Sequence, residues 1–305
     1  MAKPGKLRTS LEYAAARSIL AVLGGLPPAM ALKVGTSLGN VAYLLAADLR
    51  RTAMRNLKLA FPEKTQEERR QMIKGCFSSL GRVLGLFSQL STRSRDQLRS
   101  LIDAEGVHHL EAAKAEGNPV ILFTAHLGAW ELTSFGLSLL GHPFSFLVRR
   151  IDNPEVEKLV DKVRIRFGNQ TMDKLAAARS MVRLLRARQP LGLLFDLNAL
   201  DDEAIFVNFF GVPASTNFIT AKLALRTGAI IVPVFAPWDA KKRKFLLQVK
   251  PVVVGEVTGD EEADVRRLTE RLSLIIENEI RAYPDQWLWI HKRWKTRPPG
   301  EASIY

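Results

Sequence analysis

Two uncharged apolar runs dominate the first part of the hydrophobic pattern. The first covers Ser18–Leu32, which includes a Gly-Gly and a Pro-Pro pair, and after Lys33 the second covers Val34–Ala47. Each run is shorter than the ~18–20 residues that a membrane-spanning helix needs, and a joint span would place Lys33 inside the membrane at a cost of about 3 kcal/mol. We therefore predict two short helices around the Gly-Gly-Leu-Pro-Pro turn, which either lie in a membrane interface or pack as ordinary core helices. A cleaved signal peptide ending near Ala29-Met30-Ala31 is a third interpretation.

A helical pattern continues to about residue 90. Thr65 followed by Glu68 predicts a capping box at a helix start. Apolar residues then recur at helical spacing, at Ile73, Phe77, Leu80, Leu84 and Phe87. The first 100 residues are therefore expected to form a helical, basic, membrane-associating region.

The pattern changes after residue 100 to short apolar runs that alternate with helical segments. The runs predict strands at 119–123, 144–148, 191–195, 230–235 and 245–254, and helices are predicted at about 155–167, 171–188, 216–227 and 262–282. Strands that alternate with helices indicate an α/β fold with a mostly parallel central sheet flanked by helices. We expect residues 101–305 to form this α/β domain, with a Trp- and Arg-rich C-terminal tail.

Composition and charge limit the possible functions. The 305 residues are 47% hydrophobic, as in an ordinary globular protein, and a lone Cys76 excludes an intrachain disulfide and a Cys-based metal cluster. Residues 1–100 hold 17 Lys and Arg against 6 Asp and Glu, whereas residues 101–280 hold 22 against 23, so the net charge of +13 belongs mainly to the chain ends. Such a basic region fits nucleic acid, anionic lipid headgroups or an acidic protein. The charges that flank the apolar runs suit anionic headgroups: Lys3, Lys6, Arg8, Arg17, Arg50, Arg51, Arg55 and Lys58.

Candidate chemistry follows the predicted strand at 119–123. His126 and Glu131 lie five residues apart at a strand-to-helix junction, where α/β folds place their sites. Five helical steps would put them on different faces, so they can meet only if His126 lies in the turn and Glu131 in the first turns of the helix, a turn that Gly128 permits. Glu131 would then orient His126 as a general base for a substrate hydroxyl. A surface His beside a solvated Glu is the alternative.

These residues resemble the H-x4-D/E motif of glycerolipid acyltransferases, and more closely the H-x-G-x-W-E form of the lipid A biosynthesis (lauroyl/myristoyl) acyltransferase family. The similarity extends in order from about residue 30 to 300. It is carried by Arg55-Asn56-Leu57, Phe61-Pro62-Glu63, Arg149 with Asp152-Asn153-Pro154, Arg164-Ile165-Arg166, Phe209-Phe210-Gly211-Val212-Pro213-Ala214, Trp287–Lys295 and Arg297-Pro298. One departure is Asp196-Leu197-Asn198, where the family often has Gln or His after the Asp.

The resemblance implies an enzyme that moves a fatty acyl group from a thioester carrier to a lipid hydroxyl. His126 would be the general base and Glu131 its orienting partner, and the activated thioester would need no cofactor and no metal. The donor would be carried by acyl carrier protein, and the acceptor would be a lipid A precursor or related glycolipid. The expected place is the cytoplasmic face of an inner membrane, with an anionic lipid surface as a further partner and no nucleic acid.

The resemblance also implies substrate-binding residues, each with a structural alternative. Arg164 would stabilise the oxyanion, with Arg166 beside it, or be a solvated helix residue. Arg149 would clamp a phosphate or form a surface salt bridge. Asn153 would bind substrate or cap a helix. Asp196 would hold Arg164 or His126 in place, or be a cap or structural ion pair.

The C-terminal tail is rich in tryptophan, and three further histidines lie elsewhere in the chain. Trp287, Trp289 and Trp294 beside basic residues are typical of a membrane-interface belt, and we expect the tail to pack with headgroup contact. His108, His109 and His142 are expected at the surface.

Three rival functions stay open. One is acyl transfer from acyl-CoA to another glycolipid, such as a phosphatidylinositol mannoside. The second is a hydrolase that uses water as the acceptor. The third is a non-enzymatic nucleic-acid-binding protein, which rests on the sequence pI near 10.0 alone, because no nucleic-acid-binding motif accompanies it.

Overall fold

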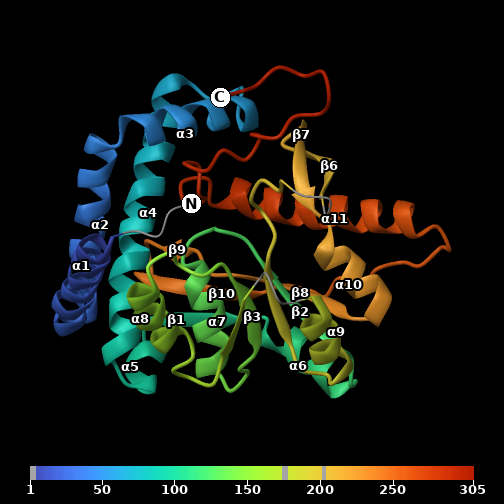
Figure 1. Cartoon of the computed structure of the whole chain (residues 1–305), viewed down its shortest axis with the longest axis horizontal. Coiled ribbons are helices and arrows are strands. Elements are labelled where there is room, and N and C mark those ends of the chain that lie inside the picture. Colours follow the sequence, from blue (N-terminus) through green and yellow to red (C-terminus); the bar gives the residue numbers. More distant parts are fainter. Residues whose placement is uncertain (1–4, 174–177, 201–203) are drawn as a thin grey trace.

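Residues 5–100 are mostly helical in the computed structural model, which describes residues 5–173, 178–200 and 204–305. Five helices precede the first strand: α1 (Lys6–Gly25), α2 (Pro28–Leu45), α3 (Ala47–Ala60), α4 (Gln66–Thr92) and α5 (Arg95–Arg99). Thr65 accepts a hydrogen bond from the Glu68 backbone, and Glu68 accepts one from that of Thr65, so the predicted capping box is confirmed. The long helix α4 runs between α1 and α2 on one side and the rest of the molecule on the other (Figure 1).

Helices α2 and α4 pack at very short range. Gly35 and Gly39 of α2 face Gly81 and Gly85 of α4, and a methyl group added at Gly81 would overlap the carbonyl oxygen of Gly35. Small residues four apart allow helix backbones to approach this closely. The glycines in the second apolar run therefore serve helix packing.

The outer faces of α1 and α2 expose large apolar side chains. Leu7, Leu11, Val22, Leu44 and Leu45 are each more than 60% exposed. In the described residues no single helix is long and apolar enough to cross a membrane, and only the pair α2 and α3 would qualify by length and composition, with a 90° bend between them. Membrane association of this region stays a prediction.

An eight-stranded sheet forms the centre of the remaining chain, in the order β1-β10-β8-β2-β5-β3-β4 with β9 beside β10. The neighbours β8, β2, β5, β3 and β4 pair in parallel, whereas β10 runs antiparallel to β8. The mostly parallel sheet is thus confirmed. Its strands are β1 (Ile102–Glu105), β2 (Val120–Thr124), β3 (Ser145–Val148), β4 (Gln170–Asp173), β5 (Leu191–Leu194), β8 (Ile230–Phe235), β9 (Trp238–Asp239) and β10 (Lys244–Val249).

Helices cover both faces of the sheet. They are α6 (Val107–Ala115), α7 (Trp130–Leu139), α8 (Pro154–Arg164), α9 (Ala178–Arg186), α10 (Ile219–Thr227) and α11 (Glu261–Ala282). Alternation along β2 shows the two sides: Ile121 and Phe123 join a core cluster with α9, α10 and α11, whereas Leu122 joins a cluster with α6 and α7. Burial on both faces explains why β2 is a continuous apolar run.

Two segments differ from the prediction. The helix expected over 171–188 is wrong at its start, because Gln170–Asp173 pairs with β3 as an edge strand; residues 174–177 lie outside the described residues, and α9 begins at Ala178. The hairpin of β6 (Ala204–Phe209) and β7 (Val212–Asn217) was not expected, and it displaces the start of the helix predicted at 216 to Ile219. Phe210 and Gly211 both have positive φ, as a two-residue type I′ turn requires.

Candidate active site

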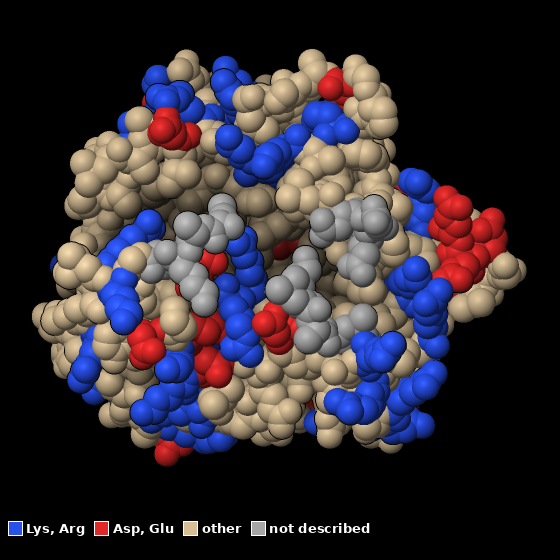
Figure 2. Space-filling view, in the orientation of Figure 1, with Lys and Arg blue, Asp and Glu red and all other residues tan. Residues whose placement is uncertain are grey.

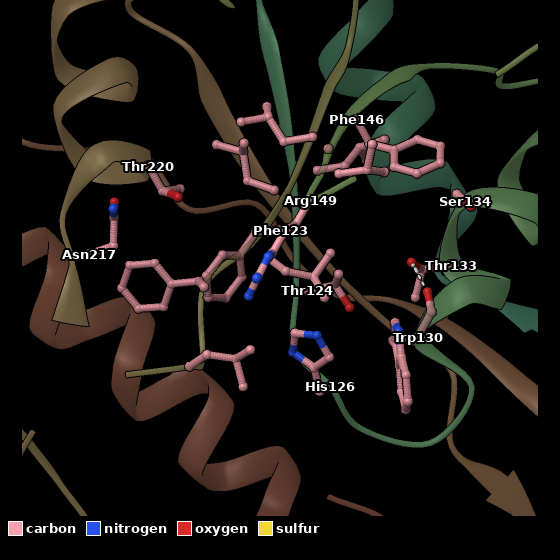
Figure 3. Close-up of a pocket in the computed structure, with 18 of the residues that line it drawn as sticks. Phe123, Thr124, His126, Trp130, Thr133, Ser134, Phe146, Arg149, Asn217 and Thr220 are labelled. Carbon is pink, nitrogen blue, oxygen red and sulfur yellow. Dashed lines mark hydrogen bonds between the residues drawn. The ribbon is translucent and has the colours of Figure 1, made fainter. Parts of the chain in front are cut away.

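A pocket of about 860 Å³ opens where parallel strands of the sheet end. His126 follows β2, Arg149 follows β3 and Asp196 follows β5. Because these strands are parallel, their carboxyl ends meet at one edge of the sheet, where α/β folds bind ligands. His126 and Arg149 line the pocket together with apolar side chains such as Phe146 (Figure 3).

The loop after β2 has the predicted shape. Gly128 has φ +56, α7 begins at Trp130, and Glu131 lies in its first turn. His126 lies in the turn before the helix, with an 18% exposed side chain. The placement of His126 and Glu131 along the strand-turn-helix unit is therefore confirmed.

Asp196, and not Glu131, contacts the ring of His126. The Nδ1 atom of His126 lies 2.8 Å from Oδ1 of Asp196, and the backbone N–H of His126 donates to Oδ2 at 2.9 Å. Trp287 donates from Nε1 to the same Oδ2 at 2.7 Å. Burial alone would raise the pKa of Asp196, but the charge of His126 and these hydrogen bonds outweigh it and hold the pKa below its usual value. Asp196 is thus an ionised, fully buried acceptor that fixes the ring of His126.

Glu131 instead binds Arg164 of α8. Its two oxygens accept from Nη2 at 2.5 Å and from Nε at 3.2 Å, and both side chains are more than 80% buried. The expected hydrogen bond from His126 to Glu131 is therefore wrong: the carboxylate at the start of α7 turns to the guanidinium across the pocket. The Nη1 atom of Arg164 is buried and finds no acceptor among the described residues.

A second histidine lies at the same pocket. The Nε2 atom of His291 accepts a hydrogen bond from the backbone N–H of Asn198 at 3.2 Å. Burial lowers the pKa of His291, which favours the neutral, accepting ring. Sequence reasoning placed His291 in the tail without a role, and its only signal was the tail motif itself.

Three cations at the pocket carry no ion pair within the described residues. Arg149, Lys292 and Lys295 all line the pocket and are exposed. A hollow with Lys and Arg side chains along its rim is visible on this face of the molecule (Figure 2). The pocket mouth is thus basic, whereas its walls are largely apolar.

Asn153 and Arg166 lie away from the pocket lining. Asn153 caps α8 by accepting from the backbone of Glu155, and its Nδ2 donates to the carbonyl of Thr9 in α1. Arg166 donates to the carbonyl of Leu90 at the end of α4. Both residues join the N-terminal helices to α8, which carries Arg164.

The tryptophans of the tail are buried. Trp287, Trp289 and Trp294 have no exposed surface, so the expected contact of these rings with headgroups is wrong and their packing role is confirmed. The tail backbone also pairs with the site loop, because Leu288 donates to the carbonyl of His126. The Trp- and Arg-rich composition, which is typical of a membrane-interface belt, here belongs to a buried aromatic core.

Across residues 5–173, 178–200 and 204–305, no three His, Cys, Asp or Glu side chains lie close enough together to hold a metal ion.

A histidine fixed by a buried carboxylate at the end of a parallel strand, beside a pocket with largely apolar walls, is typical of a ligand site in an α/β fold. Residues 5–296 match the model of the family described as bacterial lipid A biosynthesis acyltransferase. The chain therefore belongs to this family and is an acyltransferase.

Three Escherichia coli K12 proteins are similar over most of both chains. The lipid A biosynthesis palmitoleoyltransferase is 30% identical over 274 residues, which cover 89% of this chain and 87% of the relative. The lauroyltransferase is 26% identical (92% and 90%), and the myristoyltransferase 25% identical (92% and 85%).

Proposed function

We propose that the protein transfers a fatty acyl group from a carrier-borne thioester to a hydroxyl of a lipid A precursor at the cytoplasmic face of an inner membrane. The observation that carries this proposal is the His126–Asp196 pair, whose histidine lines a pocket with largely apolar walls. The similarity to lipid A acyltransferases that differ in their acyl chains supports the acceptor class.

In the proposed reaction His126 removes the proton of the acceptor hydroxyl. Asp196 accepts from Nδ1 of His126, so Nε2 is the basic nitrogen. The alcohol oxygen attacks the thioester carbonyl carbon, and the resulting tetrahedral oxyanion collapses with loss of the C–S bond. His126 then returns the proton to the leaving thiolate. The charge on His126 that appears between these steps is stabilised by the buried Asp196.

Arg164 is the candidate oxyanion donor. It lines the pocket, two of its nitrogens are held by Glu131, and its Nη1 has no acceptor among the described residues. A buried cationic N–H group without an acceptor of its own is suited to a charge that appears only in the transition state. In this proposal Glu131 positions Arg164, and Asp196 positions His126.

Arg149, Lys292 and Lys295 are the candidate contacts for an anionic group of the substrates. They lie at the pocket, and none has an ion pair within the described residues. Guanidinium and ammonium groups of this kind bind phosphate. The proposed membrane contact is the apolar outer face of α1 and α2, with basic residues beside it.

The test compares His126→Ala with His142→Ala, since His142 lies outside the pocket lining, where its Nε2 atom is 3.3 Å from Oε1 of Glu111. Each protein is incubated with an acyl thioester, with and without a lipid A precursor, and the products are followed by mass spectrometry. We expect His126→Ala to lose transfer while His142→Ala keeps the rate of the unmodified protein. An active His126→Ala protein contradicts the mechanism, and release of free fatty acid at full rate without acceptor would identify a hydrolase.

The membrane contact is tested separately by flotation with anionic liposomes. We expect the protein to float, and Leu44→Glu with Leu45→Glu to weaken flotation, because both side chains are at least 70% exposed. Flotation unchanged by these substitutions would contradict the proposed surface.

A further inference from the structure

Helix α9 presents a row of arginines. Arg179, Arg183 and Arg186 lie at positions i, i+4 and i+7, so they share one face, and all three are exposed. Arg188 follows the helix and is also exposed. Within the described residues none of the four has a hydrogen-bonded or ion-paired carboxylate.

Several other helical arginines of this chain bind carboxylates. Arg226 of α10 binds Glu261, Arg281 of α11 binds Glu277, and Arg267 of α11 binds Asp264. The row on α9 differs from these pairs, because it places three exposed arginines on one helix face with no carboxylate partner among the described residues.

The row is unfavourable for the helix itself. Like charges at i, i+3 and i, i+4 destabilise a helix by about 0.2–0.5 kcal/mol per pair. Arg183 and Arg186 lie in the last turn, where a cation is favoured, but Arg179 lies at the helix start, where the macrodipole disfavours it. The opposite face of α9 packs into the hydrophobic core, where Met181 and Leu185 are buried. Stability of the fold therefore does not explain the row.

The row begins beside the pocket. Helix α9 leads from β4 to β5, so its first turn lies at the edge of the sheet where the strands carry His126 and Asp196. It packs on β5 and on α10, and Leu193 of β5 and Thr220 of α10 line the pocket. Lys and Arg side chains gather over the part of this face where Figure 1 labels α9 (Figure 2).

We propose that this arginine face of α9 is the docking surface for the acidic carrier protein that delivers the acyl thioester. The inference rests on the proposed function, which supplies the thioester donor. An acidic helix of a carrier can face the arginine row by charge complementarity. Because the thioester is attached through a flexible arm, the carrier docks beside the pocket while its acyl chain enters it.

An anionic membrane is the less suitable occupant of this surface. Helices that lie in a membrane interface insert large apolar side chains, and the large apolar side chains exposed in the described part of the chain include none between residues 179 and 190. Helices α1 and α2, which do expose such side chains, lie at the left end of the molecule in Figure 1, whereas α9 lies to the right of its centre.

The test compares charge reversal on α9 with the same reversal on another helix. Arg179→Glu with Arg183→Glu is the test pair, and Arg70→Glu with Lys74→Glu on α4 is the control, since both pairs are exposed, spaced by four and change the net charge equally. Each protein is assayed with two donors: an acyl chain on acyl carrier protein, and the same chain on pantetheine alone. Binding of the carrier is also measured by titration at low and high salt.

We expect the α9 pair to raise KM for the carrier-borne donor about tenfold or more, which corresponds to about 1.4 kcal/mol, and to leave the rate with the pantetheine donor within about twofold. The control pair should change neither. An equal rise in KM for the carrier-borne donor in the α9 and α4 variants would overturn the docking surface. A loss of activity with both donors that occurs only in the α9 variant would also overturn it. An unmodified protein inactive on both donors would instead refute the proposed function. Carrier binding unchanged by the α9 pair, together with weaker liposome flotation, would assign the row to the membrane.

Discussion

Replacing Asp196 by Asn tests which carboxylate orients the base. Oδ2 of Asp196 accepts from two fixed donors, the backbone N–H of His126 and Nε1 of Trp287, whereas Oδ1 faces Nδ1 of His126. In Asp196→Asn the single amide oxygen must stay with the two fixed donors. The amide nitrogen then faces Nδ1 and donates to it, so the ring carries its proton on Nε2 and loses the basic nitrogen that faces the pocket.

The expected loss is large. The corresponding change in a Ser-His-Asp triad lowers kcat by about 10⁴, or about 5.4 kcal/mol of activation free energy, and we expect a loss of this order for Asp196→Asn. Glu131→Gln is the matched comparison, because Glu131 binds Arg164 and not His126. It weakens an ion pair that positions Arg164, so a loss of about tenfold to a hundredfold is expected.

The assay is the initial rate of ester formation at saturating donor, with thermal unfolding of each variant as the control for folding. Asp196→Asn should lose far more activity than Glu131→Gln while both remain folded. If Glu131→Gln loses about 10³-fold or more and Asp196→Asn stays within tenfold of the unmodified protein, Glu131 is the orienting group and the assignment made from the geometry is wrong.

Three further predictions concern stability and reactivity. Burial raises the pKa of Cys76 to about 12, so a disulfide reagent at pH 8 should modify this thiol only in denaturant, and rapid modification of the folded protein would contradict its burial. Gly81→Val should destabilise the fold by about 3 kcal/mol, because its side chain must separate α2 from α4; urea unfolding measures this, with Gly25→Ala, which has open space, as the neutral control. The lowered pKa of Asp196 means that its ionised form stabilises the fold above its unfolded pKa of about 3.9, and that this contribution is lost as pH falls through the lower folded pKa. The difference in unfolding free energy between the unmodified protein and Asp196→Asn should therefore shrink in acid. A difference that grows below pH 4 would contradict the lowered pKa of Asp196 in the folded protein.

Local sequence was sufficient to place His126 and Glu131 but not to pair them. The apolar run at β2 and the positive φ of Gly128 follow from local chemistry, and these fixed the strand-turn-helix unit. The partner of His126 depends on sheet order. Thr124 of β2 pairs with Leu194 of β5, which brings Asp196 beside His126 across 70 residues of chain. A single sequence shows that Asp196 ends a strand, but it does not show that this strand is the neighbour of β2.

The predicted headgroup contact of the tail tryptophans was wrong because their tertiary partners could not be read from the local sequence. Trp beside Lys and Arg occurs both in membrane interfaces and in cores where Arg donates to backbone carbonyls. Here Arg293 is fully buried, donates to the carbonyl of Ser215 at 2.6 Å and lies over the ring of Phe209. Burial lowers its pKa to about 10, so it is still charged at neutral pH. The hairpin that receives Arg293 was itself absent from the prediction, and so the sequence offered no partner for this charge.

Helix α3 and the C-terminal tail are linked by hydrogen bonds to the residues that hold His126. Asn56 of α3 donates to the backbone carbonyls of Trp289 and His291, each at 2.7 Å. The same tail segment carries Trp287, which donates to Asp196. The motif that begins at Arg55 thus acts through the tail on the carboxylate that fixes His126. Since α3 and α4 also share one core cluster with β2 and β5, the helical region is part of the framework of the active site, and attachment to a membrane would be a second role carried by the outer faces of α1 and α2.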